Sequence, residues 1–475
     1  MYKSNKRNNN LTSFKSDLCD LSEPLYISRF IFFYRDGQLI FLTLMLNSHT
    51  FYTMLNIKLL REAPDFVIER LNVKNFDAAL ILNSVLDLDV KRRNIQTEVD
   101  SLLAKQNTLS KEIGLLMKEG KKNEAQVVKS SVAQLKESSK DLEAKMALYS
   151  KELDTLMVQL PNLPHISVPK GKGAQDNEII KEGGTIPKLK ISIPHWELAQ
   201  KYDIIDFDLG VKLTGAGFPV YKGKGARMQR ALIAYFLDKN TSAGYNEVMP
   251  PLMVNEASGY GTGQLPDKGE QMYHVELDNF YLIPTAEVPV TNIYRDMILS
   301  QKELPIKVTA YTPCFRREAG SYGKDVRGLN RLHQFEKVEI VQISHPDSSY
   351  SALEGMVAHV ESIVQELGLP YRILRLCGGD LSFTSALTYD FEVFSAAQER
   401  WLEVSSVSNF ETFQANRLKL RFKDDKGKMQ LAHTLNGSSL ALPRIFAALL
   451  ENYQEDGKIR VPDVLVPYAG FKYID

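Results

Sequence analysis

Two long stretches of regularly spaced apolar residues in the middle of the chain restrict its fold more than any other sequence feature. Residues 65–160 contain no proline and only two glycines, Gly114 and Gly120. Steps of four and three residues alternate along two series, Ile95, Val99, Leu102, Gln106, Leu109, Ile113 and Leu116, and Val128, Val132, Leu135, Ser139, Leu142, Met146, Tyr149, Leu153, Leu156 and Leu160. This 3.5-residue period marks a coiled-coil seam. The series flank a turn-like segment at 119–123 and predict an antiparallel hairpin with arms of about 50 Å.

The distal part of this hairpin carries an excess of positive charge. Residues 105–140 contain eight lysines and four glutamates, a net charge of about +4, whereas the whole chain is neutral with 58 basic and 58 acidic residues. The neutral total excludes a uniformly basic nucleic-acid coat but permits a local basic patch. Two interpretations remain open: a solvated coiled-coil surface, or an arm that contacts the backbone of a polyanion.

The first 53 residues differ from the rest of the chain. Residues 25–46 are rich in Leu, Ile and Phe, but Arg29, Arg35 and Asp36 interrupt them. A run of about 20 apolar residues, which would span a bilayer, is therefore absent, and no small-residue cleavage site follows. We expect residues 1–53 to be an unstructured or mis-started extension; a membrane-associating leader is the alternative.

The cysteine content and one glycine-rich run exclude two kinds of site. Cys19, Cys314 and Cys377 are far apart, and no paired Cys/His spacing occurs, so we expect neither zinc nor a disulfide framework. A reducing, cytoplasmic compartment fits this pattern. The run 215–225 lacks the spacing of a nucleotide phosphate loop, and a turn around Pro219 that leads into a helix is the better interpretation.

The chain is predicted to contain a helical domain at 54–163, a linker rich in proline and glycine at 164–190 and a larger domain at 191–475. The larger domain is expected to mix helices at 227–240, 348–367 and 439–452 with strands at 331–342, 371–376, 388–394, 401–407 and 431–435. Strands and helices do not alternate regularly. An α+β fold with an antiparallel sheet and flanking helices is therefore predicted.

One segment of this domain combines charged and aromatic groups in a way that suits a nucleotide. Arg316, Arg317 and Glu318 end the apolar segment 308–315, and Arg316 and Glu318 would share a face if the strand continues through them. A glycine-rich loop, 319–330, follows. The alternation beyond it is expected to place on one face His333, Phe335, Lys337 and Glu339. Arginine suits bidentate phosphate contact and Phe335 offers a plane for a base; a surface ion-pair network is the alternative.

Two shorter segments add candidate groups. Glu403 and Ser405 would share a strand face, where a carboxylate beside hydroxyls can hold Mg²⁺ together with phosphate oxygens; an ordinary edge strand is the alternative. The segment 435–443 reads as a turn that enters an apolar helix, with Arg444 near its start. Such an arginine is either solvated or, if it faces a cleft in the sheet, able to bind phosphate.

Together these segments resemble the seryl-tRNA synthetase family, of class II aminoacyl-tRNA synthetases, bacterial type, over residues 54–475. Residues 217–251, 315–339 and 435–444 are similar to motifs 1, 2 and 3, and Thr285-Ala286-Glu287 matches the serine-site signature. The resemblance implies a catalytic sheet of six or seven antiparallel strands at 191–475 and a homodimer formed across motif 1. It also implies that the arm at 54–163 binds tRNA, with recognition led by shape.

The implied activity is that of a serine–tRNA ligase. ATP and L-serine would give seryl-adenylate, and serine would then pass to the 3′ end of tRNA(Ser), with tRNA(Sec) as a further candidate. The implied ATP site comprises Arg316, Arg317, Glu318, Leu332, Phe335, Glu403, Val404, Ser405, Ser406 and Arg444. The implied serine site comprises Thr285, Ala286, Glu287, Glu339 and Ser438. The resemblance further implies Mg²⁺ held by Glu403 and Ser406, with no zinc and no membrane partner.

The resemblance also implies a role for each group. Arg316 would neutralise the α-phosphate, and Arg444 would meet the γ-phosphate of a bent ATP; these two are the expected catalytic residues. Glu318 would accept a hydrogen bond from the adenine amino group, and Phe335 would sandwich the ring with Arg444. Thr285 and Glu287 would hold the serine ammonium.

Some positions depart from the family pattern. Ser439 replaces a frequent glycine, Val407 stands where cysteine or threonine is common, and Leu442-Pro443 precedes Arg444. Proline removes a helix donor unless it lies in the first turn, so the start of the motif 3 helix is open. Activation of an amino acid for a carrier other than tRNA is disfavoured by the long arm and the missing zinc ligands. A coiled-coil adaptor with an inactive fold is disfavoured by the retained charged groups.

Overall fold

The computed structural model describes residues 32–35, 38–41, 57–190, 192–267, 269–318 and 327–475. The chain divides into two units, Met1–Tyr52 and Thr53–Asp475. In the first unit, β1 (Phe32–Arg35) and β2 (Gln38–Phe41) pair as a two-stranded antiparallel sheet. The rest of the predicted N-terminal extension lies outside the described residues. Among the described residues, none of the helices is long and apolar enough to cross a membrane.

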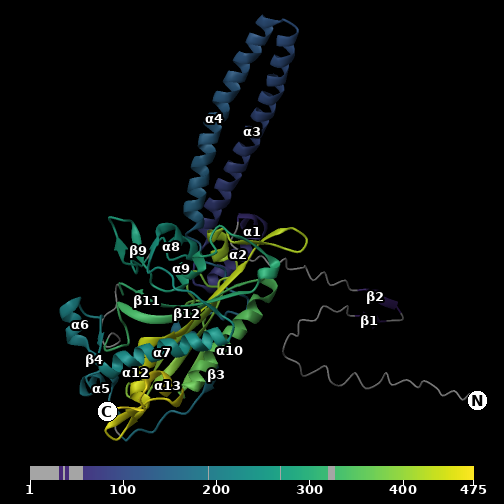
Figure 1. Ribbon diagram of the computed structural model, residues 1–475. Coiled ribbons are helices and arrows are strands. Elements are labelled where there is room, and N and C mark those ends of the chain that lie inside the picture. The colour runs from purple at the N-terminus through teal and green to yellow at the C-terminus, as the bar shows by residue number, and fades with distance from the viewer. Residues whose placement is uncertain (1–31, 36–37, 42–56, 191, 268, 319–326) are drawn as a thin grey trace, which may run out of the picture. The chain divides into compact units, whose positions relative to one another are not determined.

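The predicted helical hairpin is confirmed. It consists of α3 (Ala79–Lys118) and α4 (Lys122–Met157), which lie side by side in Figure 1. Every predicted seam position is buried or half-buried, and Gly120 adopts a φ of 76° in the turn, a conformation that glycine accepts without strain. The first helix begins at Ala79, well before the predicted seam, because Leu82 and Val85 also pack in a core at the base of the hairpin.

Two short helices, α1 (Ile57–Glu62) and α2 (Pro64–Val73), complete the arm domain. Side chains at its base then bond to the backbone of a loop in the larger domain. The Asn162 amide donates to the carbonyls of Thr384 and Phe410 at 2.9 Å each. The Lys74 ammonium donates to the carbonyls of Ser382 and Ser385 at 2.8 Å each. The base of the arm is thus bonded directly to segment 382–385.

The larger domain is built on one eight-stranded sheet. Its order is β3 (Glu178–Gly183), β13 (Tyr371–Arg375), β14 (Leu387–Ser395), β15 (Arg400–Asn409), β18 (His433–Ala441), β12 (Gln334–Ser344), β11 (Ile306–Phe315) and β6 (Asn246–Glu247). All neighbours are antiparallel except β6 and β11. The predicted antiparallel sheet is confirmed, but it has eight strands, not six or seven. The extra strands are β6, which is parallel, and β3, which segment 164–190 supplies from residues expected to be a linker.

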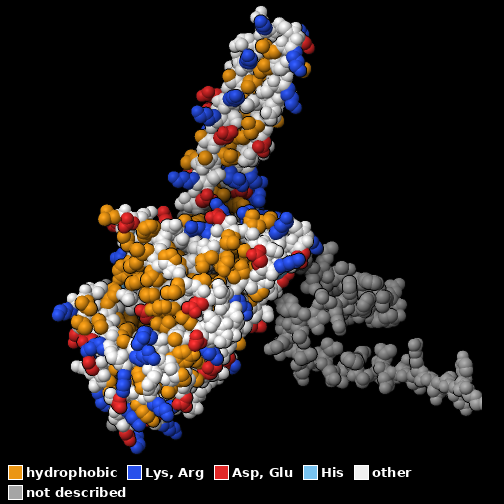
Figure 2. All heavy atoms as spheres, viewed as in Figure 1, with side chains coloured by type: hydrophobic (Ala, Val, Ile, Leu, Met, Phe, Trp, Pro, Cys, Tyr) orange, Lys and Arg blue, Asp and Glu red, His pale blue; other side chains and the backbone are white. Residues whose placement is uncertain are grey.

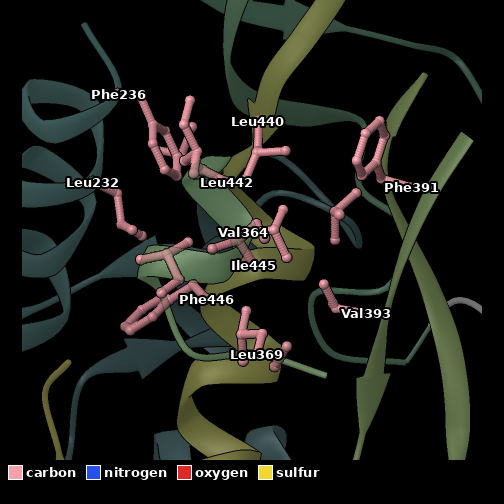
Figure 3. Packing of buried hydrophobic residues seen from close by; sticks show 14 of the residues in the cluster. Leu232, Phe236, Val364, Leu369, Phe391, Val393, Leu440, Leu442, Ile445 and Phe446 are labelled. Atoms are coloured by element: carbon pink, nitrogen blue, oxygen red, sulfur yellow. The ribbon is translucent and has the colours of Figure 1, made fainter. Parts of the chain in front are cut away.

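Helices cover one face of this sheet. The main ones are α7 (Gly223–Ser242), α10 (Ser349–Glu366) and α12 (Leu442–Asn452), joined by α13 (Val466–Ala469). Figure 3 shows Phe236 of α7, Val364 of α10 and Phe446 of α12 in one cluster, with Phe391 of β14 on its other side. The short helices α5 (His195–Lys201) and α6 (Phe207–Leu213) precede α7, with β4 (Ile205–Asp206) paired to β5 (Val220–Tyr221).

Strand β12 shows how the sheet separates core from site. Val338 and Ile340 join the helix-covered core, whereas Val341 and Ile343 pack in separate clusters with smaller elements. Because side chains alternate along a strand, Lys337 and Glu339 lie on the same side as Val341. The smaller elements in these two clusters are α9 (Glu287–Asn292), α11 (Phe413–Leu418), β10 (Ile298–Ser300), β16 (Arg421–Lys423) and β17 (Met429–Leu431). The other short elements of the domain are α8 (Glu256–Thr262), β7 (Met253–Asn255), β8 (His274–Val275) and β9 (Phe280–Leu282). The three-stranded sheet β19 (Gln454–Glu455), β20 (Lys458–Arg460) and β21 (Tyr473–Ile474) ends the chain.

Several predicted boundaries move. The last helix begins at Leu442, not at 439, because Ser439 and its neighbours continue β18. Pro443 therefore falls in the first helical turn, where its missing N–H would have no partner in any case. Strand β11 ends at Phe315 and β12 begins at Gln334. Arg316 and Glu318 consequently lie outside a strand, and the predicted shared face does not form.

Candidate active site

A cleft of about 720 Å³ opens between β12, β15 and β18 and the loops that flank them. It collects thirteen of the predicted site residues in its wall: Thr285, Glu287, Arg316, Glu318, Leu332, Phe335, Glu339, Glu403, Val404, Ser405, Ser406, Ser438 and Arg444. Two predicted residues lie elsewhere. Ala286 is fully buried in the apolar cluster behind α9, because its side chain is small and apolar. Arg317 is exposed, and its backbone N–H donates to the Gln271 carbonyl at 2.8 Å.

A buried polar triad forms one end of the cleft. Lys337 lies 2.7 Å from the Glu339 carboxylate and donates to the Thr285 hydroxyl at 3.0 Å. The same hydroxyl donates to Glu339 at 2.9 Å. Only 8% of the Lys337 side chain and 3% of the Glu339 side chain are exposed. The pair is charge-balanced, and the Thr285 hydroxyl bridges its two members, which helps to offset the cost of burying two charges together.

A second carboxylate borders this triad. Glu287 is the first residue of α9, and its backbone N–H donates to the Thr285 hydroxyl at 3.2 Å. Gln414 donates to its carboxylate. Burial first, and then the charge of Glu339, raise the pKa of Glu287 to about 7, against the opposing effects of Gln414 and Lys337. A cation entering the cleft would reverse this, because it favours the ionised carboxylate.

Arg316 and Phe335 meet at the centre of the cleft. The guanidinium lies over the phenyl ring at 5.1 Å from its centroid, within the range of a cation–π contact. Its Nε donates to the Pro284 carbonyl at 3.3 Å. Glu318 forms an ion pair with Arg331 and adopts a φ of 50°. The stack that the structure shows on Phe335 is with Arg316, whereas the sequence led us to expect one with Arg444 around a base.

Arg444 is fixed at the opposite rim by backbone groups. Its Nε donates to the Asn330 carbonyl at 3.1 Å, and its Nη1 donates to the Glu403 carbonyl at 2.7 Å. The Glu403 carboxylate lies 3.9 Å from Nη1 and is half exposed. The guanidinium is therefore aimed by main-chain carbonyls, and its charge is only partly neutralised. It is available to an anion in the cleft.

Strand β15 is irregular at the groups predicted to hold a metal. A bulge between the registers of Glu403 and Ser405 interrupts the alternation from which their shared face was predicted. Val404 and Ser405 are buried, and the Ser405 hydroxyl donates to the Ser438 carbonyl. Ser406 lies opposite Asp390 on β14. Glu403 and Ser406 nonetheless border the same cleft.

Asp390, which lies opposite Ser406, bears on whether these groups could hold Mg²⁺. It is 9% exposed, and its Oδ1 is buried with no hydrogen-bond partner. Burial, and then the charge of Glu403, raises the pKa of Asp390 well above its usual range. Among the described residues, groups of three or more metal-ligating side chains are absent. Mg²⁺ is usually held by one or two carboxylates with substrate phosphates and water, so Glu403, Ser406 and the orphaned oxygen nearby fit that ion.

Several site residues were missed from the sequence. Lys337 was placed on the correct face without a role, and Gln414, Asn330 and Asp390 were not singled out at all. Each gains its function from a contact across the fold, such as Gln414 with Glu287. Local spacing carries no signal for such contacts. Much of the predicted loop at 319–330, namely 319–326, lies outside the described residues.

Comparison with known proteins decides the family. Residues 54–164 match the sequence model described as the seryl-tRNA synthetase N-terminal domain. Residues 273–453 match the tRNA synthetase class II core domain (G, H, P, S and T). The serine–tRNA ligase of Salinibacter ruber is 49% identical over 424 residues, which are 89% of this chain and 99% of the relative. The chain belongs to the seryl-tRNA synthetase family. Its sheet, its arm and its enzymatic class, aminoacyl-tRNA ligase, are those predicted from the sequence.

Other seryl-tRNA synthetases agree with this assignment. The serine–tRNA ligase of Akkermansia muciniphila is 48% identical, over 88% of this chain and 98% of the relative. The crystal structure of seryl-tRNA synthetase from Pyrococcus horikoshii complexed with ATP superimposes with a TM-score of 0.83 at 34% identity, over 89% of this chain and 99% of the other. The cytoplasmic enzyme of Naegleria fowleri in complex with AMP gives a TM-score of 0.79 at 26% identity, also over 89% and 99%.

Proposed function

We propose that this serine–tRNA ligase carries out both steps of its reaction in the 720 Å³ cleft. The observation that carries the proposal is the convergence there of two guanidinium groups and the buried polar triad of Thr285, Lys337 and Glu339, from segments far apart in the sequence. In the first step the serine carboxylate displaces pyrophosphate from ATP. That carboxylate is ionised at neutral pH, so the attack needs alignment and charge neutralisation more than a general base.

The charged groups divide the work by position. Arg316, at the centre of the cleft, neutralises the α-phosphate as charge develops on it, while its stack on Phe335 gives way to the adenine ring. Arg444 holds the outer phosphates at the rim. Glu318, with Arg331, and the backbone of Leu332 border the adenine. Removing one such charge-stabilising donor typically costs about 10²–10³ in rate.

Serine occupies the end of the cleft formed by the buried triad. Glu287 accepts the α-ammonium, with Thr285 beside it, and Glu339 and Ser438 contact the hydroxymethyl side chain and the carboxylate. A site that hydrogen-bonds a substrate hydroxyl rejects an analogue lacking it by about 10⁴–10⁵, because its own polar groups are otherwise left unpaired. The burial of Glu339 makes that penalty apply here, since water does not reach the carboxylate.

The cleft would also accommodate a Mg²⁺ ion beside the phosphates of ATP. Glu403 and Ser406 would hold it, with the Asp390 carboxylate behind Ser406, and when bound it would neutralise phosphate charge. The residues of the chain themselves orient the triphosphate between Arg316 and Arg444 and keep the serine carboxylate in line with the α-phosphate.

The arm at 54–163 is proposed to bind tRNA(Ser), and tRNA(Sec) remains a further candidate. All eight lysines between 105 and 140 are exposed, and Figure 2 shows basic side chains distributed along the hairpin. A helix of 40 residues is about 60 Å long, so the tip suits a ligand much larger than the cleft. Dimerisation across motif 1, which includes α7, completes the proposal.

Serine-dependent exchange of radioactive pyrophosphate into ATP tests the first step. Exchange with serine, but not with alanine or threonine, is expected. An absence of exchange in folded protein would instead favour an adaptor with an inactive site. Exchange without charging of tRNA(Ser), but with charging of another carrier, would favour activation for a different acceptor.

A further inference from the structure

A buried histidine and carboxylate lie beneath the rim of the cleft and have no part in the roles assigned so far. His195 is the first residue of α5, and Glu451 lies near the end of α12, two helices that adjoin in Figure 1. The imidazole Nδ1 is 2.7 Å from Glu451 Oε1, and both side chains are fully buried. A buried ionisable pair of this kind needs a partner for every polar atom.

Each polar atom of the pair has one. The Glu451 carboxylate accepts from the His195 backbone N–H at 3.0 Å, from Gln398 at 3.1 Å and from the Ser395 hydroxyl. The Nε2 of His195 accepts the backbone N–H of Leu329 at 2.8 Å. Because a backbone N–H can only donate, the proton of the neutral ring is on Nδ1, where Glu451 receives it. The carboxylate therefore fixes both the tautomer and the orientation of the ring.

The accepted N–H belongs to the segment that holds Arg444. Leu329 precedes Asn330, whose carbonyl accepts from Arg444 Nε at 3.1 Å and whose amide donates to Gln398 at 2.9 Å. Gly328, at a φ of 66°, lies so close to the ring that a Cβ there would sit 2.2 Å from its Nε2. The backbone at 328–330 is thus in direct contact with the imidazole on one side and with the Arg444 guanidinium on the other.

We propose that His195, oriented by Glu451, is a positioning residue that fixes segment 328–330 and, through the Asn330 carbonyl, the guanidinium of Arg444. The inference rests on the proposed function, since it assumes that Arg444 binds the phosphates of ATP. Helix α12 supplies both ends of this hydrogen-bond network: Arg444 in its first turn and Glu451 near its last residue. The rim of the nucleotide site is therefore set by His195, Glu451 and Gln398, which do not line the cleft themselves.

Two substitutions at one position separate positioning from simple packing. His195→Asn places an amide where Nδ1 was, keeps a donor for Glu451 and loses the acceptor for Leu329. His195→Gln extends an amide oxygen to the place of Nε2 and keeps that acceptor. In serine-dependent ATP–pyrophosphate exchange we expect His195→Asn to lower kcat/KM for ATP by about 10²-fold, the effect of a misplacement of about 1 Å at a catalytic group. His195→Gln is expected to recover most of that loss, and the KM for serine should change little in either variant.

Combination with Arg444→Ala tests the route. If His195 acts through Arg444, His195→Asn adds little further loss in the Arg444→Ala background, because residues in one network are not additive. Equal losses in the Asn and Gln variants, or a full additional loss in the double variant, would overturn the proposal. If exchange is normal in His195→Asn but impaired in Arg444→Ala, only the positioning role of His195 is rejected. If exchange is normal in Arg444→Ala, the proposed role of Arg444 itself is rejected.

Gln398→Ala keeps the proposal testable if His195→Asn does not fold, as judged by circular dichroism. Gln398 is half-buried and bridges Asn330 to Glu451, so its removal weakens the same anchor without opening the core. We expect a smaller loss in kcat/KM for ATP that also disappears in the Arg444→Ala background. An unchanged kcat/KM for ATP would contradict the anchoring role of the network.

Discussion

Serine binding by this enzyme should strengthen as the pH rises from about 6 to about 8, because in the proposed serine site Glu287 must lose a proton before it can pair with the substrate ammonium. Burial and the neighbouring charge of Glu339 raise the pKa of Glu287 to about 7. A carboxyl group with that pKa is about one-tenth ionised at pH 6 and about nine-tenths ionised at pH 8. Apparent affinity scales with the competent fraction, so the KM for serine should fall about tenfold over this interval.

The assay is ATP–pyrophosphate exchange at saturating ATP, with the KM for serine measured at half-unit steps of pH. Glu287→Gln should bind serine weakly and without this pH dependence. Glu411→Gln is the matched control: burial also raises the pKa of Glu411 to about 7, but this residue is not part of the wall of the cleft. A flat KM profile in the unmodified enzyme, or a slope that persists in Glu287→Gln, would refute the assigned contact.

Three further outcomes are expected. Arg316→Ala should abolish exchange while the circular dichroism spectrum is kept; near-normal exchange in the folded variant would refute its role at the α-phosphate. Deletion of residues 106–138 should leave exchange nearly intact and cripple tRNA charging, measured in parallel on one preparation; a parallel fall of both would contradict a separate tRNA-binding arm. Glu411→Gln should raise Tm at pH 8 and much less at pH 5. The folded pKa of Glu411 lies above its ordinary value of 4.5, so the folded state loses stability as the pH rises from about 4.5 to about 7. The loss in the free energy of unfolding is up to about 3 kcal/mol, at about 1.4 kcal/mol per pKa unit. An equal change in Tm at both pH values would refute this linkage.

The sequence predicted those parts of the fold whose signals are local and repeated. The hairpin follows from the seam between Ile95 and Leu160, because a 3.5-residue apolar repeat is buried by packing one helix against another, independently of the rest of the chain. The helix predicted at 227–240 is confirmed within α7, where Met228, Leu232 and Tyr235 are buried at the helical spacing of three to four residues. Boundaries were less certain: Ser439 looked like the start of a helix by local pattern but lies within β18, at a bulge between Ser438 and Ala441, which both pair with β12. The pairing of these neighbours outweighs the local preference.

The candidate site was predictable to the extent that its residues lie in motifs. Arg316 and Glu339 came from motif 2 and Arg444 from motif 3, and the structure places all three in one cleft. The spacing of these residues along the chain does not indicate which ion-pair or stacking partner each side chain has in the folded protein. The ion pair of Glu318 with Arg331 and the stack of Arg316 on Phe335 depend on how two strand ends and a loop converge.

What the sequence determined by itself was the architecture of the chain, its reactive groups and the family to which it belongs. Periodicity and motifs involve residues that are close together in the sequence, so they can be recognised without knowledge of the fold. Only the tertiary structure decided the electrostatic state of those groups. Glu287 holds its proton near neutral pH because elements distant in sequence bury it beside Glu339, and His195 reaches Leu329 across more than a hundred residues. Burial and long-range hydrogen bonds arise when segments meet, and they are therefore properties of the folded molecule.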